Sequence, residues 1–266
     1  MELDLFQVDA FTAVPLRGNP AAVCPLHSWL DDALLQAIAR ENNLSETAFL
    51  EGGDGLYRLR WFTPAAEVDL CGHATLASAW VVFRHLEPGR ERVRFETKSG
   101  PLDAWREGSR IVLDFPSRPP RPCDDPPPLE KALFAEPQEI LDAPYWLAVL
   151  ATEREVRELA PDMALLERIH RPVIATAPGT DCDFVSRFFA PALGIPEDPV
   201  TGSAHCTLVP YWSARLDLPR LFARQLSPRG GELWCEDKGE RVRIAGEVAP
   251  YLEGRIQIGS AERPRG

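Results

Sequence analysis

Cys71-Gly72-His73-Ala74-Thr75 and, in the second half of the chain, Thr201-Gly202-Ser203-Ala204-His205 are two short stretches that decide the fold. Each is a glycine-containing turn that leads into an apolar run, at residues 74–83 and 204–212. The first run carries only two polar side chains, and in the second the polar side chains are few and small. A helix that is apolar on all sides is buried on all sides. Two such helices in a chain rich in strands predict a curved sheet wrapped around a central helix, twice.

Strand patterns dominate the rest of the chain. They predict strands at residues 3–11, 45–50, 57–63, 92–97, 102–106, 110–115, 145–151, 173–177, 184–189, 221–226, 232–236, 241–247 and 255–258. Helices are predicted at residues 31–42, 74–85, 153–159, 163–169 and 203–216, the first with Ser28 as its N-cap. The predicted fold class is α+β, with two similar domains that are each a barrel-like β-sheet around a central apolar helix.

A proline-rich segment separates the two halves. Residues 116–128 hold seven prolines in thirteen positions, which excludes a central strand or a helix interior. We interpret this segment as the linker between an N-terminal domain at residues 1–117 and a C-terminal domain at residues 118–266. The last strand is expected to pack back on the N-terminal domain.

The bulk composition excludes several classes of protein. The 266 residues carry 29 Lys+Arg against 40 Asp+Glu, a net charge of -11, which argues against nucleic acid or an anionic membrane as the partner. No run reaches the roughly 18 apolar residues of a membrane span, and the start lacks the pattern of a signal peptide. The six cysteines include no C-x-x-C pair. We therefore expect a cytoplasmic protein with reduced thiols.

The two glycine turns suggest how a ligand is held. The first N–H groups of a helix have no intrahelical partner and lie at the positive end of its dipole, so they bind a carboxylate or an oxyanion well. Two such ends, one from each half, could hold one small acid between them. The alternative is two ordinary helix starts in which glycine fits a tight turn.

Five motifs in the order of the chain resemble a known family. They are Gly18-Asn19-Pro20-Ala21-Ala22-Val23, Asn43-Leu44-Ser45-Glu46-Thr47-Ala48-Phe49, Phe62-Thr63-Pro64, Cys71-Gly72-His73-Ala74-Thr75 and Glu197-Asp198-Pro199-Val200-Thr201-Gly202-Ser203-Ala204. Together they are similar to the PhzF-type isomerases of phenazine biosynthesis, which have the diaminopimelate-epimerase-like fold. The resemblance extends from about residue 4 to 248. It implies an active site in the cleft between two domains, a homodimer and no cofactor.

The resemblance also implies roles for individual residues. Glu46 matches the catalytic base, and His73 and Asp198 match residues that shape the proton-transfer site. The substrate-binding positions that it implies are Asn19, Gly72, Gly202 and Ser203. The implied function is a cofactor-independent isomerase that moves a proton within a small carboxylate-bearing substrate by Glu acid/base catalysis.

Three alternatives remain at this point. Epimerases of this fold use two cysteines, one from each turn, but here Cys71 is matched by Thr201, whose hydroxyl is a very weak acid. A thiol-dependent epimerase that uses Cys71 alone is therefore disfavoured, and we interpret Cys71 as a packing residue. Zinc binding by Cys71, His73, His205 and Cys206 is also disfavoured, because their spacing suits a tetrahedral site poorly. The third alternative is a non-catalytic protein that binds a small molecule.

Overall fold

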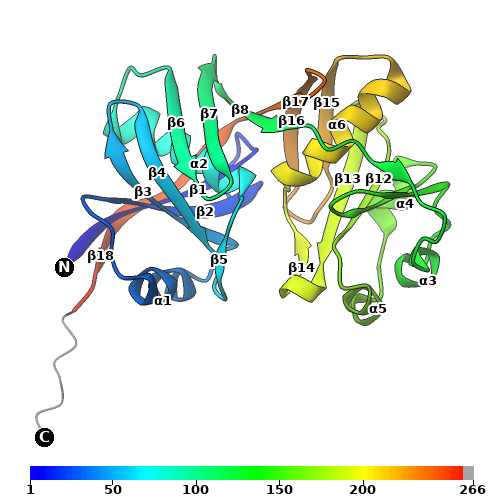
Figure 1. Cartoon of the computed structure of the whole chain (residues 1–266), viewed down its shortest axis with the longest axis horizontal. Coiled ribbons are helices and arrows are strands. Elements are labelled where there is room, and N and C mark those ends of the chain that lie inside the picture. The colour runs from blue at the N-terminus through cyan, green and yellow to red at the C-terminus, as the bar shows by residue number, and fades with distance from the viewer. Residues whose placement is uncertain (260–266) are drawn as a thin grey trace, which may run out of the picture.

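Two central helices organise the computed structural model, which describes residues 1–259. Helix α2 (Gly72–Val81) packs against the N-terminal strands, and α6 (Gly202–Leu216) packs against the C-terminal strands (Figure 1). Both helices start at the glycine of the turn itself, rather than after it. Helix α2 continues as a π-helical turn, η1 (Val82–Leu86). Among the described residues, the helices are too short or too polar to cross a membrane.

The N-terminal half is a sheet around α2, with α1 (Asp32–Asn42) on its outside. Its strands are β1 (Glu2–Ala10), β2 (Asn19–Leu26), β3 (Glu46–Gly53), β4 (Leu56–Phe62), β5 (Glu67–Val68), β6 (Arg92–Thr97), β7 (Gly100–Glu107) and β8 (Arg110–Pro116). The sequence patterns missed β2. This strand pairs with β1 on one side and parallel to β3 on the other, so residues on both of its faces are buried and the alternation that marks a strand is absent.

Ser28 does not cap α1, so that prediction is wrong. The N-cap is Asp31, and no side chain caps the helix there. The helix begins at residue 32, which places Ser28 too far ahead of it to reach the first free N–H groups.

The C-terminal half repeats the plan around α6. Its strands are β9 (Arg121–Pro122), β10 (Glu139–Asp142), β11 (Trp146–Val149), β12 (Val173–Pro178), β13 (Phe184–Ala190), β14 (Ile195–Asp198), β15 (Arg220–Gln225), β16 (Gly231–Asp237) and β17 (Arg241–Gly246). Its other helices are α3 (Leu129–Leu133), α4 (Glu153–Glu158), α5 (Met163–Arg168) and the 3₁₀ turn η2 (Pro191–Leu193). Strand β9 lies within the proline-rich segment and pairs with β10, so part of that segment belongs to the sheet.

Two strand pairs join the halves. Strand β8 pairs with β17, and β18 (Val248–Gln257) returns to pair with β1 along nearly its whole length. The strand predicted at residues 255–258 is thus the end of a longer one. Strand β18 therefore lies beside β1 in the N-terminal half (Figure 1).

An ion pair with a buried carboxylate adds a further link between the halves. Arg229, in the loop before β16, places Nη2 2.7 Å from Oδ1 of Asp9, which is 2% exposed. Its Nε donates to the Gly18 carbonyl oxygen at 2.8 Å, and the N–H of Gly18 donates to the Gly230 carbonyl oxygen at 2.9 Å. These contacts fasten the β1–β2 loop to the C-terminal half immediately before Asn19.

Replacing Arg229 with Met is expected to lower the free energy of unfolding by about 3 kcal/mol, because the Asp9 carboxylate would stay buried without its cation. Urea unfolding followed by circular dichroism measures the change. The control is Arg255→Met, which breaks exposed pairs with Glu2 and Asp4 and should cost about 1 kcal/mol or less. Equal losses in the two variants would contradict the importance given to this link.

Candidate active site

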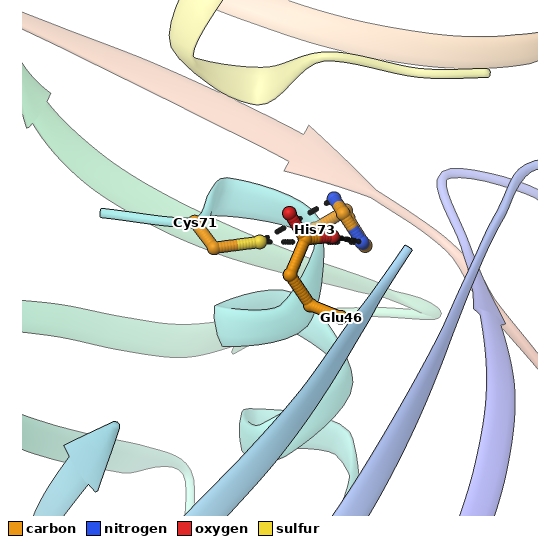
Figure 2. Close-up of side chains that lie close together, drawn as sticks. All are labelled: Glu46, Cys71 and His73. Carbon is orange, nitrogen blue, oxygen red and sulfur yellow. Dashed lines mark hydrogen bonds and ion pairs between the residues drawn. The ribbon is translucent and has the colours of Figure 1, made fainter. Parts of the chain in front are cut away.

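Three predicted site residues converge at the start of α2 (Figure 2). Glu46 is the first residue of β3, Cys71 is the N-cap of α2, and His73 is the second residue of that helix. Oε2 of Glu46 lies 2.9 Å from Nε2 of His73, and Sγ of Cys71 lies 3.5 Å from Nδ1 of His73. All three residues are buried. The imidazole therefore sits between a carboxylate and a thiol.

Asn19 extends this cluster across the interface between the halves. Its Nδ2 lies 3.1 Å from Nδ1 of His73, and it donates to Oδ1 of Asp198 at 2.8 Å and to the Val200 carbonyl oxygen at 2.9 Å. Its Oδ1 is buried and has no hydrogen-bond partner among the described residues. The structure thus brings Glu46, His73 and Asp198 into one line of contacts through Asn19, although they come from different strands and helices.

The glycines at the two turns face each other. A Cβ added at Gly72 would lie 3.2 Å from Cα of Gly202, and one added at Gly202 would lie 3.3 Å from Cα of Gly72. Only glycine permits two backbones to approach so closely. The N-termini of α2 and α6 are the positive ends of the two helix dipoles, and they therefore lie next to each other. They are beside the line of contacts from Glu46 to Asp198.

Cys71 and Thr201 occupy equivalent places in the two halves. Each is the N-cap of its central helix, and neither side chain makes a capping hydrogen bond. The Thr201 hydroxyl instead donates to Oδ2 of Asp198 at 2.5 Å. The residue equivalent to Cys71 in the second half is therefore engaged as a hydrogen-bond donor to a carboxyl group.

Ser203 lies apart from this line of contacts and reveals a residue that the sequence reasoning missed. Its Oγ is 3.1 Å from the hydroxyl of Tyr145, whose ring packs edge-on against Phe188 with 4.9 Å between centroids. Tyr145 precedes β11 in a loop, and no local pattern marks it.

Gln225 was also missed: its Nε2 donates to the Asp198 carbonyl oxygen at 2.7 Å, and its Oε1 accepts from the Thr201 N–H at 2.8 Å. The signal in the sequence that could have found Gln225 is its polar side chain at the end of a strand.

Burial and neighbouring charges set the protonation of the site. Burial raises the pKa of Asp198 to about 6. Burial also raises the pKa of the Cys71 thiol to about 11, so this thiol is protonated at neutral pH. For His73, burial opposes the charged form while Cys71 and Glu46 favour it, and the net result is a pKa well above its usual value. His73 is therefore a group beside Glu46 that holds a proton more firmly than a free imidazole does.

The raised pKa of Asp198 makes stability fall as pH rises from about 4, its usual value, to about 6. In this window the folded state binds a proton that the unfolded state has released. The difference of about two pKa units corresponds to about 3 kcal/mol. Urea unfolding at several pH values should show this loss in the unmodified protein and not in Asp198→Asn. His73 acts at higher pH, since the stability from its raised pKa is lost only above about 6.5. The same dependence of stability on pH in the unmodified protein and in Asp198→Asn would contradict the role given to Asp198.

The four residues considered for zinc are not assembled. Nδ1 of His205 donates to the Thr201 carbonyl oxygen at 2.9 Å, and burial lowers the pKa of His205 to about 4. Cys206 faces the Gly202 carbonyl oxygen within its own helix. Glu46, Cys71 and His73 have potential ligand atoms within 4.8 Å of one another. A metal there would have to displace the protons of the thiol and the imidazolium and break the contact between Glu46 and His73.

Comparisons with known proteins show the family and the fold of the chain. A family model described as phenazine biosynthesis-like protein matches residues 8–254. An uncharacterized isomerase of Pseudomonas aeruginosa is 53% identical over 259 residues, which covers 97% of this chain and 100% of that protein. The crystal structure of a PhzF-family phenazine biosynthesis protein from Enterococcus faecalis superposes with a TM-score of 0.94 at 44% identity, over 97% of this chain and 100% of the other.

The fold is shared more widely than the sequence. The structure of a hydroxyproline epimerase from Agrobacterium vitis superposes with a TM-score of 0.66 at 11% identity, over 96% of this chain and 92% of that one. At this identity the likeness concerns the fold alone. The predicted α+β fold with a sheet around a central helix in each half, and the predicted family resemblance, are confirmed.

Proposed function

We propose a reaction for this chain, which belongs to the phenazine biosynthesis-like (PhzF) family and is an isomerase. It moves a proton within a small carboxylate-bearing substrate without a cofactor. The observation that carries the proposal is the buried line of contacts from Glu46 through His73 and Asn19 to Asp198, beside the two helix ends that meet at Gly72 and Gly202.

Glu46 is the acid/base of the proposed reaction. Its carboxylate takes a proton from a carbon of the substrate and returns it to a different carbon of the same molecule, so no atom is gained or lost. His73, whose Nε2 lies 2.9 Å from Oε2 of Glu46, stabilises the carboxylate when it is protonated and can share the proton after the transfer. Asp198, with a pKa of about 6, is a second group that can hold a proton near neutral pH.

The helix ends hold the substrate and its developing charge. The first N–H groups of α2 and α6 have no partner within their helices, and both helices point their positive ends at the same place. A substrate carboxylate bound there places the negative charge that forms on its conjugated system beside the same dipoles. Ser203, the second residue of α6, and Tyr145 supply hydroxyl groups near the start of that helix. Because Glu46, His73 and Asp198 are buried, the halves must part to admit the substrate.

The epimerase alternative has less support. A racemisation through thiols needs a thiolate on one face of the carbon and an acid on the other. The pKa of Cys71 is raised to about 11, and its counterpart at the start of α6 is Thr201, whose hydroxyl donates to Asp198. The homodimer implied by the family resemblance and the cytoplasmic location expected from the cysteines and the composition stay predictions.

A screen of small carboxylic acids in deuterated water tests the proposal. We expect deuterium to enter a C–H position of the true substrate, detected by mass spectrometry or NMR, and the Cys71→Ser variant to retain substantial exchange, because a neutral buried thiol is replaced by a similar neutral group. Complete loss of exchange in Cys71→Ser would restore the thiol-dependent epimerase. Tight binding of an acid without any exchange would instead indicate a non-catalytic binding protein.

A further inference from the structure

A cavity lies at the C-terminal end of the central helix of the N-terminal half, away from the candidate active site. It has a volume of about 510 Å³ and lies between η1, the turn from β7 to β8, and β18. The residues that matter here are Trp80, Arg84, His85, Arg106, Arg110 and Glu253. Arg84 is eleven positions along the helix from His73, a rise of roughly 16 Å, so this cavity is separate from the candidate active site.

Three arginines that line this cavity have no acidic partner among the described residues. Arg84, Arg106 and Arg110 form no ion pair with any carboxylate among residues 1–259, whereas most arginines that pair do so at 2.7–3.4 Å. Glu253 lies 3.6 Å from His85, so it is directed to the imidazole. In a chain with a net charge of -11, three unpaired cations around one cavity make a strong local positive field.

Two of the three arginines are held in position. Nη2 of Arg106 donates to the Phe83 carbonyl oxygen at 2.6 Å. The Arg110 guanidinium lies 3.6 Å from the centre of the Trp234 ring, and its Nε is buried without a hydrogen-bond partner. Groups that are already ordered lose less conformational entropy when they bind a ligand.

The end of the helix explains only part of this charge. A helix C-terminus carries a partial charge of about -0.5, which basic residues in its last turn and around it complement. Arg84 and His85 are in that turn, and Arg106 binds one of its carbonyl oxygens. Three positive charges outweigh this partial charge and the single negative charge of Glu253 together, so a net positive charge is left to attract an anion.

We propose that this cavity binds a small phosphate ester that carries a ring. A phosphate monoester has a charge of about -1.5 to -2 at neutral pH and three acceptor oxygens, which suits several guanidinium groups at once, whereas one carboxylate is satisfied by a single bidentate arginine. The half-buried Trp80 offers an apolar surface for the ring. The volume falls within the range of small-molecule sites. This proposal does not depend on the isomerase mechanism.

Isothermal titration calorimetry with adenosine monophosphate as the probe tests the proposal. We expect saturable binding at one site per chain, weaker by tenfold or more in Arg84→Ala and in Arg110→Ala. The matched control is Arg92→Ala, which removes an exposed arginine that lies over the Trp105 ring outside the cavity and should leave binding unchanged. Thermal melting of each variant confirms that it is folded.

Two further probes separate the parts of the ligand. Adenosine, which has the ring without the phosphate, and inorganic phosphate, which has the anion without the ring, should each bind at least tenfold more weakly than adenosine monophosphate. Absence of saturable binding at millimolar concentration, equal binding in both cavity variants, or inorganic phosphate that binds as tightly as the ester would overturn the proposal.

Discussion

Replacing Glu46 with Gln is expected to lower the rate of solvent deuterium exchange into the substrate by about 1,000-fold, within the range that general acid–base catalysis contributes. The amide has nearly the shape of the carboxylate but cannot accept a proton from carbon. Substrate affinity should stay within a few-fold, because the carboxylate of the substrate is held by the ends of α2 and α6 and not by Glu46. Exchange measured by mass spectrometry and affinity measured by calorimetry separate the two effects.

The control for this prediction is Glu51→Gln. Glu51 lies on the same strand, β3, near its other end, and pairs with Arg58 at the surface. The same chemical change there should leave exchange unaltered. If Glu46→Gln exchanged deuterium as fast as the unmodified protein, the catalytic role of Glu46 would be wrong, whereas an equal loss of affinity and rate would assign it to substrate binding.

Replacing Gly202 with Ala is expected to lower the turnover rate by about 100-fold. The added Cβ would lie 3.3 Å from Cα of Gly72, and because that neighbour is backbone it cannot rotate out of the way. The two helix ends must separate by a few tenths of an ångström or more. Small displacements of groups that position a substrate cost catalysis heavily. Overpacking of this kind should also lower the free energy of unfolding by about 1–3 kcal/mol.

Gly53→Ala is the matched control for the contact between the helix ends. Gly53 lies at the end of β3, where an added Cβ meets no atom within 4 Å. Exchange rates and urea unfolding of both variants show whether the effect depends on the contact between the halves. A Gly202→Ala variant as active as Gly53→Ala would mean that the close approach of α2 and α6 is unnecessary for the reaction.

The sequence predicted most of what depends on burial alone. The apolar runs after Cys71 and Thr201 are the two central helices because an apolar side chain on every face has no place but the interior. Prediction from the sequence failed where a segment lacks the alternation or the spacing that marks its structure. Strand β2 carries buried residues on both faces, and its two prolines at 20 and 25 resemble a turn. Ser28 has the right chemistry for a cap, but the helix begins too late for it to reach.

The sequence by itself determined that there are two halves, that each is built around a buried helix, and which residues resemble those of a family. These properties follow from local periodicity and from motifs of a few residues. Only the tertiary structure decided that Gly72 meets Gly202, that Asn19 joins His73 to Asp198, that Arg229 secures Asp9, and that three arginines surround one cavity. Each of these contacts joins residues that are distant in the chain, so each depends on how the strands and halves pack and not on any pattern along the sequence.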